Sequence, residues 1–147
     1  MAEWRMICCA VDFSEPSLVA VRQAAVVARR FDADLTLAHV HEKSTKVGSS
    51  ASLFGLALEQ VERSGAESQR AHAQQSSGGQ AMTNLPVRSV LLTGEPASEI
   101  LRYLRENPFD LLVVGTHGRT GVRALLLGSV AERLVREAPC QILVVRG

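Results

Sequence analysis

A glycine-rich stretch between residues 115 and 129 contains the residue types that could hold a phosphate group. Glycines stand at positions 115, 118 and 121, and the pair Gly128-Ser129 follows. Glycine lets the backbone approach a bulky anion, and its N–H groups can point toward that anion. If a helix begins at Gly128-Ser129, its unpaired first N–H groups and its dipole also favour a negative charge. The stretch therefore predicts a phosphate site.

The same residues allow a purely structural interpretation. Ser129 and Glu132 have the S-x-x-E spacing of a capping box, which would occupy the helix N–H groups without any ligand. The stretch has neither the Gly-Lys-Ser/Thr ending of a Walker A loop nor a G-x-G-x-x-G fingerprint. The spacing alone therefore leaves phosphate binding and a ligand-free strand-to-helix turn equally open.

The elements that would position this stretch alternate along the chain. Apolar runs predict strands at residues 5–11, 35–41, 87–93, 110–115 and 141–146. Apolar residues at helical spacing and helix-start signals predict helices at residues 14–31, 52–75, 94–107 and 129–138. Residues 43–52 are polar and predict a loop, and Gly78-Gly79 ends the second helix.

This order predicts an α/β fold, a doubly wound parallel sheet with helices on both faces, formed by one domain over residues 1–147. In such sheets, ligands bind beyond the carboxyl ends of the strands, where the winding direction reverses. Asp12 follows the first strand and Gly115 closes the fourth. If these strands are neighbours, both residues face one crevice. The residue pattern does not by itself fix the strand order.

Composition narrows the function classes. Among the 147 residues, 16 Lys and Arg balance 15 Asp and Glu, and only 4% are aromatic, so a nucleic-acid partner is not expected. No apolar run reaches the roughly 20 residues that span a bilayer, so no membrane association is expected. We also expect no signal peptide and a cytoplasmic location. Cys8, Cys9 and Cys140 lack a C-x-x-C spacing and are interpreted as small core residues.

A few further residues could bind a ligand, but an ordinary role is the favoured interpretation. His39 and His41 share one side of a strand and could share a metal, yet no third ligand stands at a recognisable spacing. His117, Arg119 and Arg123 could contact a phosphate or simply be solvated.

The glycine-rich stretch is part of a longer resemblance. Gly115-x-x-Gly118, nine residues and then Gly128-Ser129-Val130 resemble the ATP-binding signature of the universal stress protein family. The segments at residues 7–14, 37–40, 93–97 and 139–145 are similar to other parts of the same family. The resemblance covers nearly the whole chain and is weakest at residues 43–81, whose conformation the sequence leaves open.

The resemblance implies the strand order 3-2-1-4-5 and a role for each matching position. Asp12 would accept hydrogen bonds from the ribose hydroxyls or the adenine. Val40 and Val114 would flank the adenine, with Val11 adding apolar contact. Gly115 would let the ribose approach. The phosphates would be held by Gly118, Gly128, Ser129 and the backbone N–H of Val130.

The function that the resemblance implies is that of an ATP-binding regulatory protein of the stress response. ATP, or else AMP or ADP, would bind with Mg²⁺, and the nucleotide state would modulate an unknown protein partner. A homodimer would form through residues 142–145, which begin with Ile142 and end with Val145. These residues form an apolar strand that would lie at the edge of the sheet.

Two other functions remain open. One is a ligand-free interaction protein of the same fold. The other is a slow ATPase or an adenylating enzyme. The S-G-G-x-D-S loop of adenylating enzymes is absent after the first strand. Asp12 could hold Mg²⁺ or orient water, but one carboxylate does not make an efficient ATPase. We therefore expect no enzyme, and at most slow ATP hydrolysis.

Overall fold

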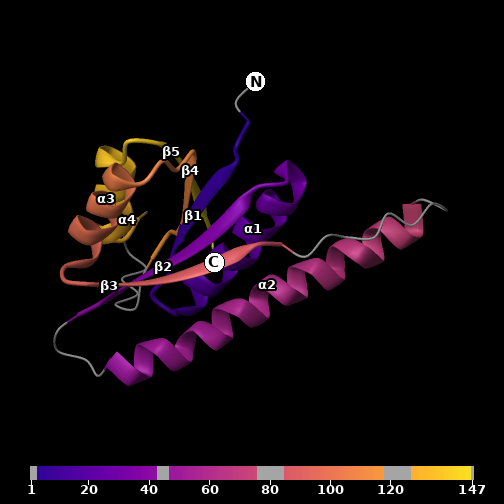
Figure 1. Ribbon diagram of the computed structural model, residues 1–147, viewed down its shortest axis with the longest axis horizontal. Coiled ribbons are helices and arrows are strands. Elements are labelled where there is room, and N and C mark those ends of the chain that lie inside the picture. Colours follow the sequence, from indigo (N-terminus) through magenta and orange to yellow (C-terminus); the bar gives the residue numbers. More distant parts are fainter. Residues whose placement is uncertain (1–2, 43–46, 76–84, 118–126, 147) are drawn as a thin grey trace.

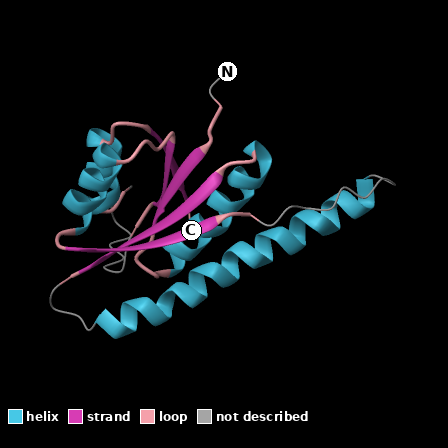
Figure 2. Cartoon of the chain, viewed as in Figure 1, coloured by secondary structure: helices cyan, strands magenta, loops and turns pink. Residues whose placement is uncertain are grey.

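The computed structural model describes residues 3–42, 47–75, 85–117 and 127–146 (Figure 1). Its strands are β1 (Met6–Ala10), β2 (Asp34–His41), β3 (Val87–Thr93), β4 (Leu111–Gly115) and β5 (Gln141–Val145). Its helices are α1 (Glu15–Phe31), α2 (Val47–Gln75), α3 (Pro96–Glu106) and α4 (Ser129–Glu137). Strands and helices alternate in this part of the chain, as the sequence predicts (Figure 2).

The five strands form one parallel sheet in the order β3-β2-β1-β4-β5. This order confirms the one that the resemblance implies. It makes β2 and β4 the two neighbours of β1, so the chain winds in opposite directions from the centre of the sheet. The point of reversal lies between β1 and β4, where an open α/β sheet binds its ligands.

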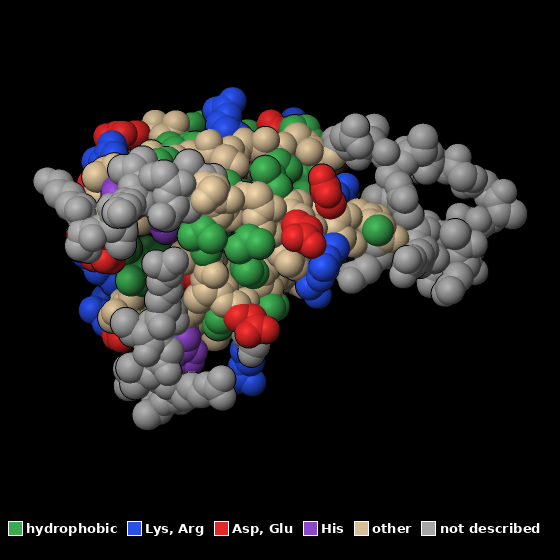
Figure 3. All heavy atoms as spheres, turned by 90° about the horizontal axis from the view of Figure 1, so that it is seen from below, with side chains coloured by type: hydrophobic (Ala, Val, Ile, Leu, Met, Phe, Trp, Pro, Cys, Tyr) green, Lys and Arg blue, Asp and Glu red, His purple; other side chains and the backbone are tan. Residues whose placement is uncertain are grey.

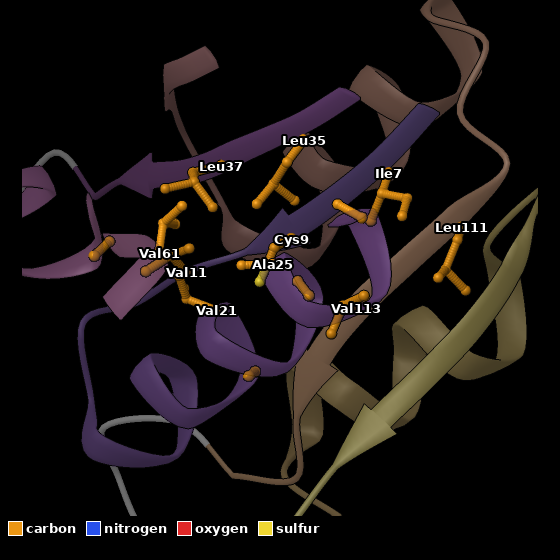
Figure 4. Close-up of a cluster of buried hydrophobic side chains, with 14 of the residues drawn as sticks. Ile7, Cys9, Val11, Val21, Ala25, Leu35, Leu37, Val61, Leu111 and Val113 are labelled. Atoms are coloured by element: carbon orange, nitrogen blue, oxygen red, sulfur yellow. The ribbon is translucent and has the colours of Figure 1, made fainter. Parts of the chain in front are cut away.

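Two apolar clusters cover the two faces of the sheet. Helices α1 and α2 pack on one face, and α3 and α4 pack on the other (Figure 1). The first cluster places side chains of β1 and β4, such as Ile7 and Val113, against Val21 and Ala25 of α1 (Figure 4). Side chains alternate along a strand, so Cys8 faces the second cluster and Cys9 the first.

The cysteines of β1 are core residues, as predicted. Cys8 and Cys9 are fully buried, and this burial raises the pKa of both thiols. A buried thiol with a raised pKa carries little reactive thiolate. Both side chains therefore serve packing.

Helix α2 corrects one prediction. The predicted loop at residues 43–52 extends too far, because the structure is helical from Val47 onward. Phe54, Ala57 and Val61 are buried and belong to the first cluster. Once this packing has nucleated a helix, adding a turn at its end costs little, because nucleation is the expensive step. Polar composition alone could not reveal that gain.

The opposite end of α2 extends beyond the sheet (Figure 1). Gly65 lies inside α2, where glycine is normally unfavourable, and its packing explains why a glycine stands at this position. A Cβ at this position would lie 2.8 Å from a guanidinium nitrogen of Arg29 of α1. The same guanidinium donates a 3.0 Å hydrogen bond to the carbonyl oxygen of Val61. The glycine therefore leaves room for the Arg29 guanidinium where it bonds to α2.

The surface carries both charge signs. On the face drawn in Figure 3, acidic and basic side chains are interspersed among apolar ones. Exposed ion pairs one helical turn apart, such as Arg63 with Glu59, contribute to this mixture. Within the described ranges, no helix combines the length and apolar character needed to cross a bilayer.

Candidate functional site

Most of the predicted site residues lie at or just beyond the carboxyl ends of three neighbouring strands. Cys9 of β1 is in register with Leu37 of β2 and with Val113 of β4. The pairing of β1 with β2 continues past the strand, because the N–H of Val11 donates to the carbonyl oxygen of Ala38 at 2.9 Å. The carboxyl ends of β1, β2 and β4 therefore meet at the same edge, which confirms the adjacency that a shared crevice requires.

Asp12 lies in the turn between β1 and α1. One oxygen of its carboxylate, Oδ1, accepts hydrogen bonds from the N–H and the hydroxyl of Ser14. Its own N–H donates to the hydroxyl of Ser17 at 3.0 Å. Ser14 is the N-cap of α1. The carboxylate therefore helps to start a helix, in addition to the role in sugar binding that remains a prediction.

The three predicted apolar contacts lie on two different faces of the sheet. Val40 and Val114 belong to the cluster under α3 and α4 and are 7% and 3% exposed. Val11 belongs to the cluster under α1 and α2, and Figure 4 shows it beside Val21 and Val61. A base at this edge would thus find Val40 and Val114 together, on the face opposite the Val11 side chain.

Gly115 has a packing reason to be glycine. A Cβ at this position would lie 3.0 Å from the carbonyl oxygen of Pro16 and 3.3 Å from the backbone nitrogen of Ser17. Both atoms belong to the first turn of α1 and cannot move as a flexible side chain would. The end of β4 thus lies directly against the start of α1.

Thr116, the residue after β4, forms backbone hydrogen bonds with residues on either side of α4 in the sequence. The N–H of Gly128 donates to the carbonyl oxygen of Thr116 at 2.7 Å, and the N–H of Thr116 donates to Val145 at 3.1 Å. These bonds place the start of α4 beside the end of β4. Gly118, Arg119 and Arg123 lie outside the described residues.

The structure does not form the capping box that the sequence leaves open for Ser129 and Glu132. The N-cap is Gly128, with φ −67° and ψ 161°, and no side chain in the described part of the chain caps the helix. Ser129 is the first residue inside the helix, so its hydroxyl is not at the capping position. Glu132 instead pairs with Arg136, one turn further along.

The start of α4 is accessible from solvent. Ser129 is exposed, and Val130 is 38% exposed. The first N–H groups of a helix lack partners within that helix, and its dipole places partial positive charge there. Because no side chain among the described residues caps this end either, the exposed N-terminus of α4 is a suitable place for an anion.

His39 has a structural role beside the site, which is the ordinary role that the sequence favours. It is 8% exposed, and its Nδ1 lies 2.7 Å from the carbonyl oxygen of Val11. Its ring also packs against Phe13 and Phe54. Within the described residues, no group of three or more His, Cys, Asp or Glu side chains could hold a metal ion, so the structure gives His39 and His41 no such site.

A polar link between α3 and α4 was missed. The Glu95 carboxylate caps α3 by accepting from the N–H groups of Ala97 and Ser98 at 3.3 and 2.8 Å. Arg133 of α4 donates to the same carboxylate at 3.1 Å and to the Ser98 hydroxyl at 3.0 Å. These bonds, first those with Ser98, hold the pKa of Glu95 below its ordinary value. They tie the candidate anion-binding helix to its neighbour.

The sequence is similar to known proteins over almost its full length. It is 33% identical over 144 residues to a universal stress protein of Methanocaldococcus jannaschii, covering 97% of this chain and 82% of that protein. It is 27% identical over 143 residues to the universal stress protein YxiE of Bacillus subtilis, covering 93% of this chain and 95% of the other.

Solved structures share the fold. The universal stress protein UspA of Lactobacillus plantarum superposes with a TM-score of 0.71 at 25% identity, over 99% of this chain and all of the other. A universal stress protein in complex with cAMP gives 0.73 at 22% identity over 99% and 98%. One from Archaeoglobus fulgidus in complex with dAMP gives 0.68 at 19% identity over 98% and 99%.

The sequence model of the Universal stress protein family matches residues 3–146. This match, the curated relatives and the strand order agree with one another. The chain belongs to the universal stress protein family.

Proposed function

We propose that this protein binds an adenine nucleotide, ATP in the first place and AMP or ADP otherwise, at the carboxyl edge of β1 and β4. The observation that carries the proposal is the start of α4, which is exposed, has no cap from any side chain that the structure describes, and lies beside the end of β4. The adenine chemistry is supported by the resemblance of the glycine-rich stretch and by the relatives solved with cAMP and dAMP.

The phosphates would bind at the start of α4. There, the N–H groups of Ser129 and Val130 and the Ser129 hydroxyl can donate hydrogen bonds. A charge-assisted hydrogen bond contributes about 1.5–3 kcal/mol, so two or three of them are enough for useful affinity. Gly118 is assigned to the same phosphates from the sequence signature alone.

The sugar and the base would lie toward β1 and β2. Asp12 stands at the end of β1, and its carboxylate can accept hydrogen bonds from ribose hydroxyls. Val40 and Val114, on the two strands beside β1, offer apolar side chains on one face for the adenine. The nucleotide would thus run from β2 across β1 to α4.

Mg²⁺ would enter with the phosphates. This ion prefers oxygen ligands and usually keeps several waters, needing only one or two carboxylates from the protein. Asp12 is the carboxylate at this edge that fits that requirement. One carboxylate at a nucleotide site does not supply an efficient base, so we propose a binding protein with at most slow hydrolysis.

We propose that the nucleotide state acts on a dimer. Strand β5 pairs with β4 on one side and is last in the order of the sheet. The side chains of Ile142, Leu143, Val144 and Val145 are all partly exposed. An apolar edge strand favours pairing with a second copy of the chain. The shape of the resulting dimer could then differ between nucleotide states, and a regulatory partner could recognise that difference. Light scattering that gives a monomer at micromolar concentration would exclude this dimer.

A ligand-free interaction protein is the second candidate. The close approach of Gly115 to Pro16 favours it, because that glycine is needed for packing even without a nucleotide. Thermal unfolding separates the candidates. A nucleotide at 100 times its Kd stabilises the folded state by about 2.7 kcal/mol, whereas the ligand-free candidate predicts no change.

The direct test is chemical analysis of the purified protein. The protein is purified gently and precipitated with acid, and the supernatant is analysed by mass spectrometry for ATP, ADP and AMP. Equilibrium dialysis against each nucleotide, with and without Mg²⁺, follows on the stripped protein. We expect a bound adenine nucleotide, or millimolar or tighter affinity. Neither carried nucleotide nor binding at millimolar concentration would refute the proposal.

A further inference from the structure

The turn that carries Asp12 has an uncommon backbone conformation. Phe13, the next residue, has φ of 64°, in the left-handed region that residues with large side chains rarely adopt. Such a conformation persists where surrounding contacts hold it. The contacts around Phe13 therefore help to determine where the Asp12 carboxylate lies.

His39 of β2 contacts the residues on both sides of Asp12. Its Nδ1 lies 2.7 Å from the carbonyl oxygen of Val11. A carbonyl oxygen can only accept, so this nitrogen carries the proton and donates it. The centroid of the imidazole lies 4.5 Å from that of the Phe13 ring, with the planes 45° apart. One buried side chain thus fixes both chain neighbours of the carboxylate.

Phe54 of α2 completes this aromatic cluster. Its ring centroid lies 5.3 Å from that of Phe13 and 6.3 Å from that of His39, edge to face in both cases. Phe54 and His39 are each 8% exposed. Because neighbouring rings pack against the imidazole, it cannot rotate away from Val11 without moving them. The hydrogen bond is therefore held in place by packing.

We propose that His39 is a positioning residue for the nucleotide site. Through the bond from Nδ1–H to Val11, it fixes the left-handed turn at Phe13 and thereby presents the Asp12 carboxylate to the nucleotide. The effect on affinity rests on the proposed function, whereas the effect on the turn does not.

Two substitutions separate the hydrogen bond from the ring. In His39→Asn, the amide nitrogen stands as many bonds from the backbone as Nδ1 does, so the donor is kept and the ring is lost. In His39→Phe, the ring is kept and the donor is lost. Leu35→Val is the control, since Leu35 is a buried residue of the apolar cluster under α1 and α2, near the other end of β2. It lowers stability without touching the turn.

Two measurements are made on each protein. Calorimetry gives the Kd for ATP, and hydrogen exchange gives the protection of the Asp12 and Ser14 amides, both bonded within the turn. We expect His39→Phe to weaken ATP binding by about tenfold or more, the effect of misaligning one charge-assisted hydrogen bond. The same variant should lose protection at both amides. The Kd of His39→Asn should stay within about threefold of the wild-type value, which is a smaller change in free energy than the loss of one such hydrogen bond. Leu35→Val should bind ATP as the wild type does.

Two results would overturn the proposal. One is a His39→Phe protein with wild-type affinity and protection. The other is a His39→Asn protein that loses as much as His39→Phe, since a donor at this position would then not be enough to hold the turn. If the wild type fails to bind ATP, the proposed function fails, and the amide protection still decides whether His39 holds the turn. Should His39→Phe not fold, His39→Leu replaces it in the same comparison.

Discussion

The end of β4 and the start of α1 are in direct backbone contact, because a Cβ at Gly115 would lie 3.0 Å from the carbonyl oxygen of Pro16. Two reasons for a glycine thus coincide at one position. A Cβ here would crowd backbone atoms of α1 whether or not a nucleotide is bound, and the proposed site uses the same close approach for the ribose. The effect of this glycine on packing can be measured as a change in stability without any ligand.

Gly115→Ala should lower the free energy of unfolding by about 1–3 kcal/mol in the absence of nucleotide, the usual cost of forcing a group into a packed region. Gly55→Ala is a matched control, since a Cβ there meets nothing within 4 Å and the residue lies inside α2. The control should stabilise by about 0.5–1 kcal/mol. Urea unfolding measures both. Equal effects of the two substitutions would contradict the packing argument.

Ser129→Ala should leave the unliganded protein within about 0.5 kcal/mol of the wild type, because its hydroxyl does not cap α4. It should nevertheless weaken ATP binding. Ser14→Ala is the comparison, since the Ser14 side chain caps α1 and its loss should cost about 1 kcal/mol. Thermal unfolding without nucleotide gives the stabilities, and calorimetry gives the affinity. A loss of about 1 kcal/mol in unliganded Ser129→Ala would restore the capping role.

Glu95 should make stability depend on pH in the acid range. Its pKa is lowered from 4.5 in the folded protein, first by hydrogen bonds with Ser98 and also by Arg133, so folding favours the ionised form. This stabilisation is fully present above the unfolded pKa and is lost as the pH falls through the lowered folded value.

The comparison is with Glu95→Gln, which keeps an acceptor but not the charge. The wild type should be the more stable protein above pH 4.5, and the difference should shrink as the pH falls below it. Denaturant unfolding between neutral pH and pH 3 follows this difference. A difference that stays constant over the range would show that the carboxylate charge does not stabilise α3.

Gly65 and Arg29 should be energetically coupled across α1 and α2. In the wild type, a Cβ at Gly65 would displace the guanidinium from the Val61 carbonyl oxygen. In an Arg29→Ala background that conflict is gone, and Gly65→Ala should stabilise by about 0.5–1 kcal/mol. A double-mutant cycle in urea should therefore give a coupling of about 1 kcal/mol or more. Additive effects would show that the guanidinium moves aside without cost.

The sequence predicts the sheet well because its signals there are local and strong. The apolar run in β4 indicates a strand buried on both faces, and Pro16 and Pro96 indicate helix starts. The strand order follows from the family resemblance, since the residue pattern alone does not fix it.

The sequence predicts less where distant contacts decide the structure. Residues 47–52 lack large apolar side chains other than Val47, and they are helical because the following turns pack on α1. The S-x-x-E spacing at Ser129 fits a capping box, yet the helix begins one residue too early for it. Neither result can be obtained from local spacing.

In the candidate site too, some features can be predicted from the sequence and others depend on distant contacts. The ends of β1, β2 and β4 meet as expected, which brings Asp12, Val40 and Gly115 to one edge. The bond between His39 and Val11 joins residues 28 positions apart, and the left-handed backbone of Phe13 has no sequence signal, since the residue is neither glycine nor asparagine. Such features become visible only when the chain is folded.

The proposed function requires a nucleotide whose phosphates lie at the start of α4 and whose sugar lies at Asp12. An amide NMR titration of the isotope-labelled protein with ATP tests both ends at once. We predict saturable shifts at Gly115, Gly128, Ser129 and Val130 together with Asp12, reduced at the α4 residues when AMP replaces ATP. Shifts confined to another surface, or none at millimolar ATP, would contradict the account.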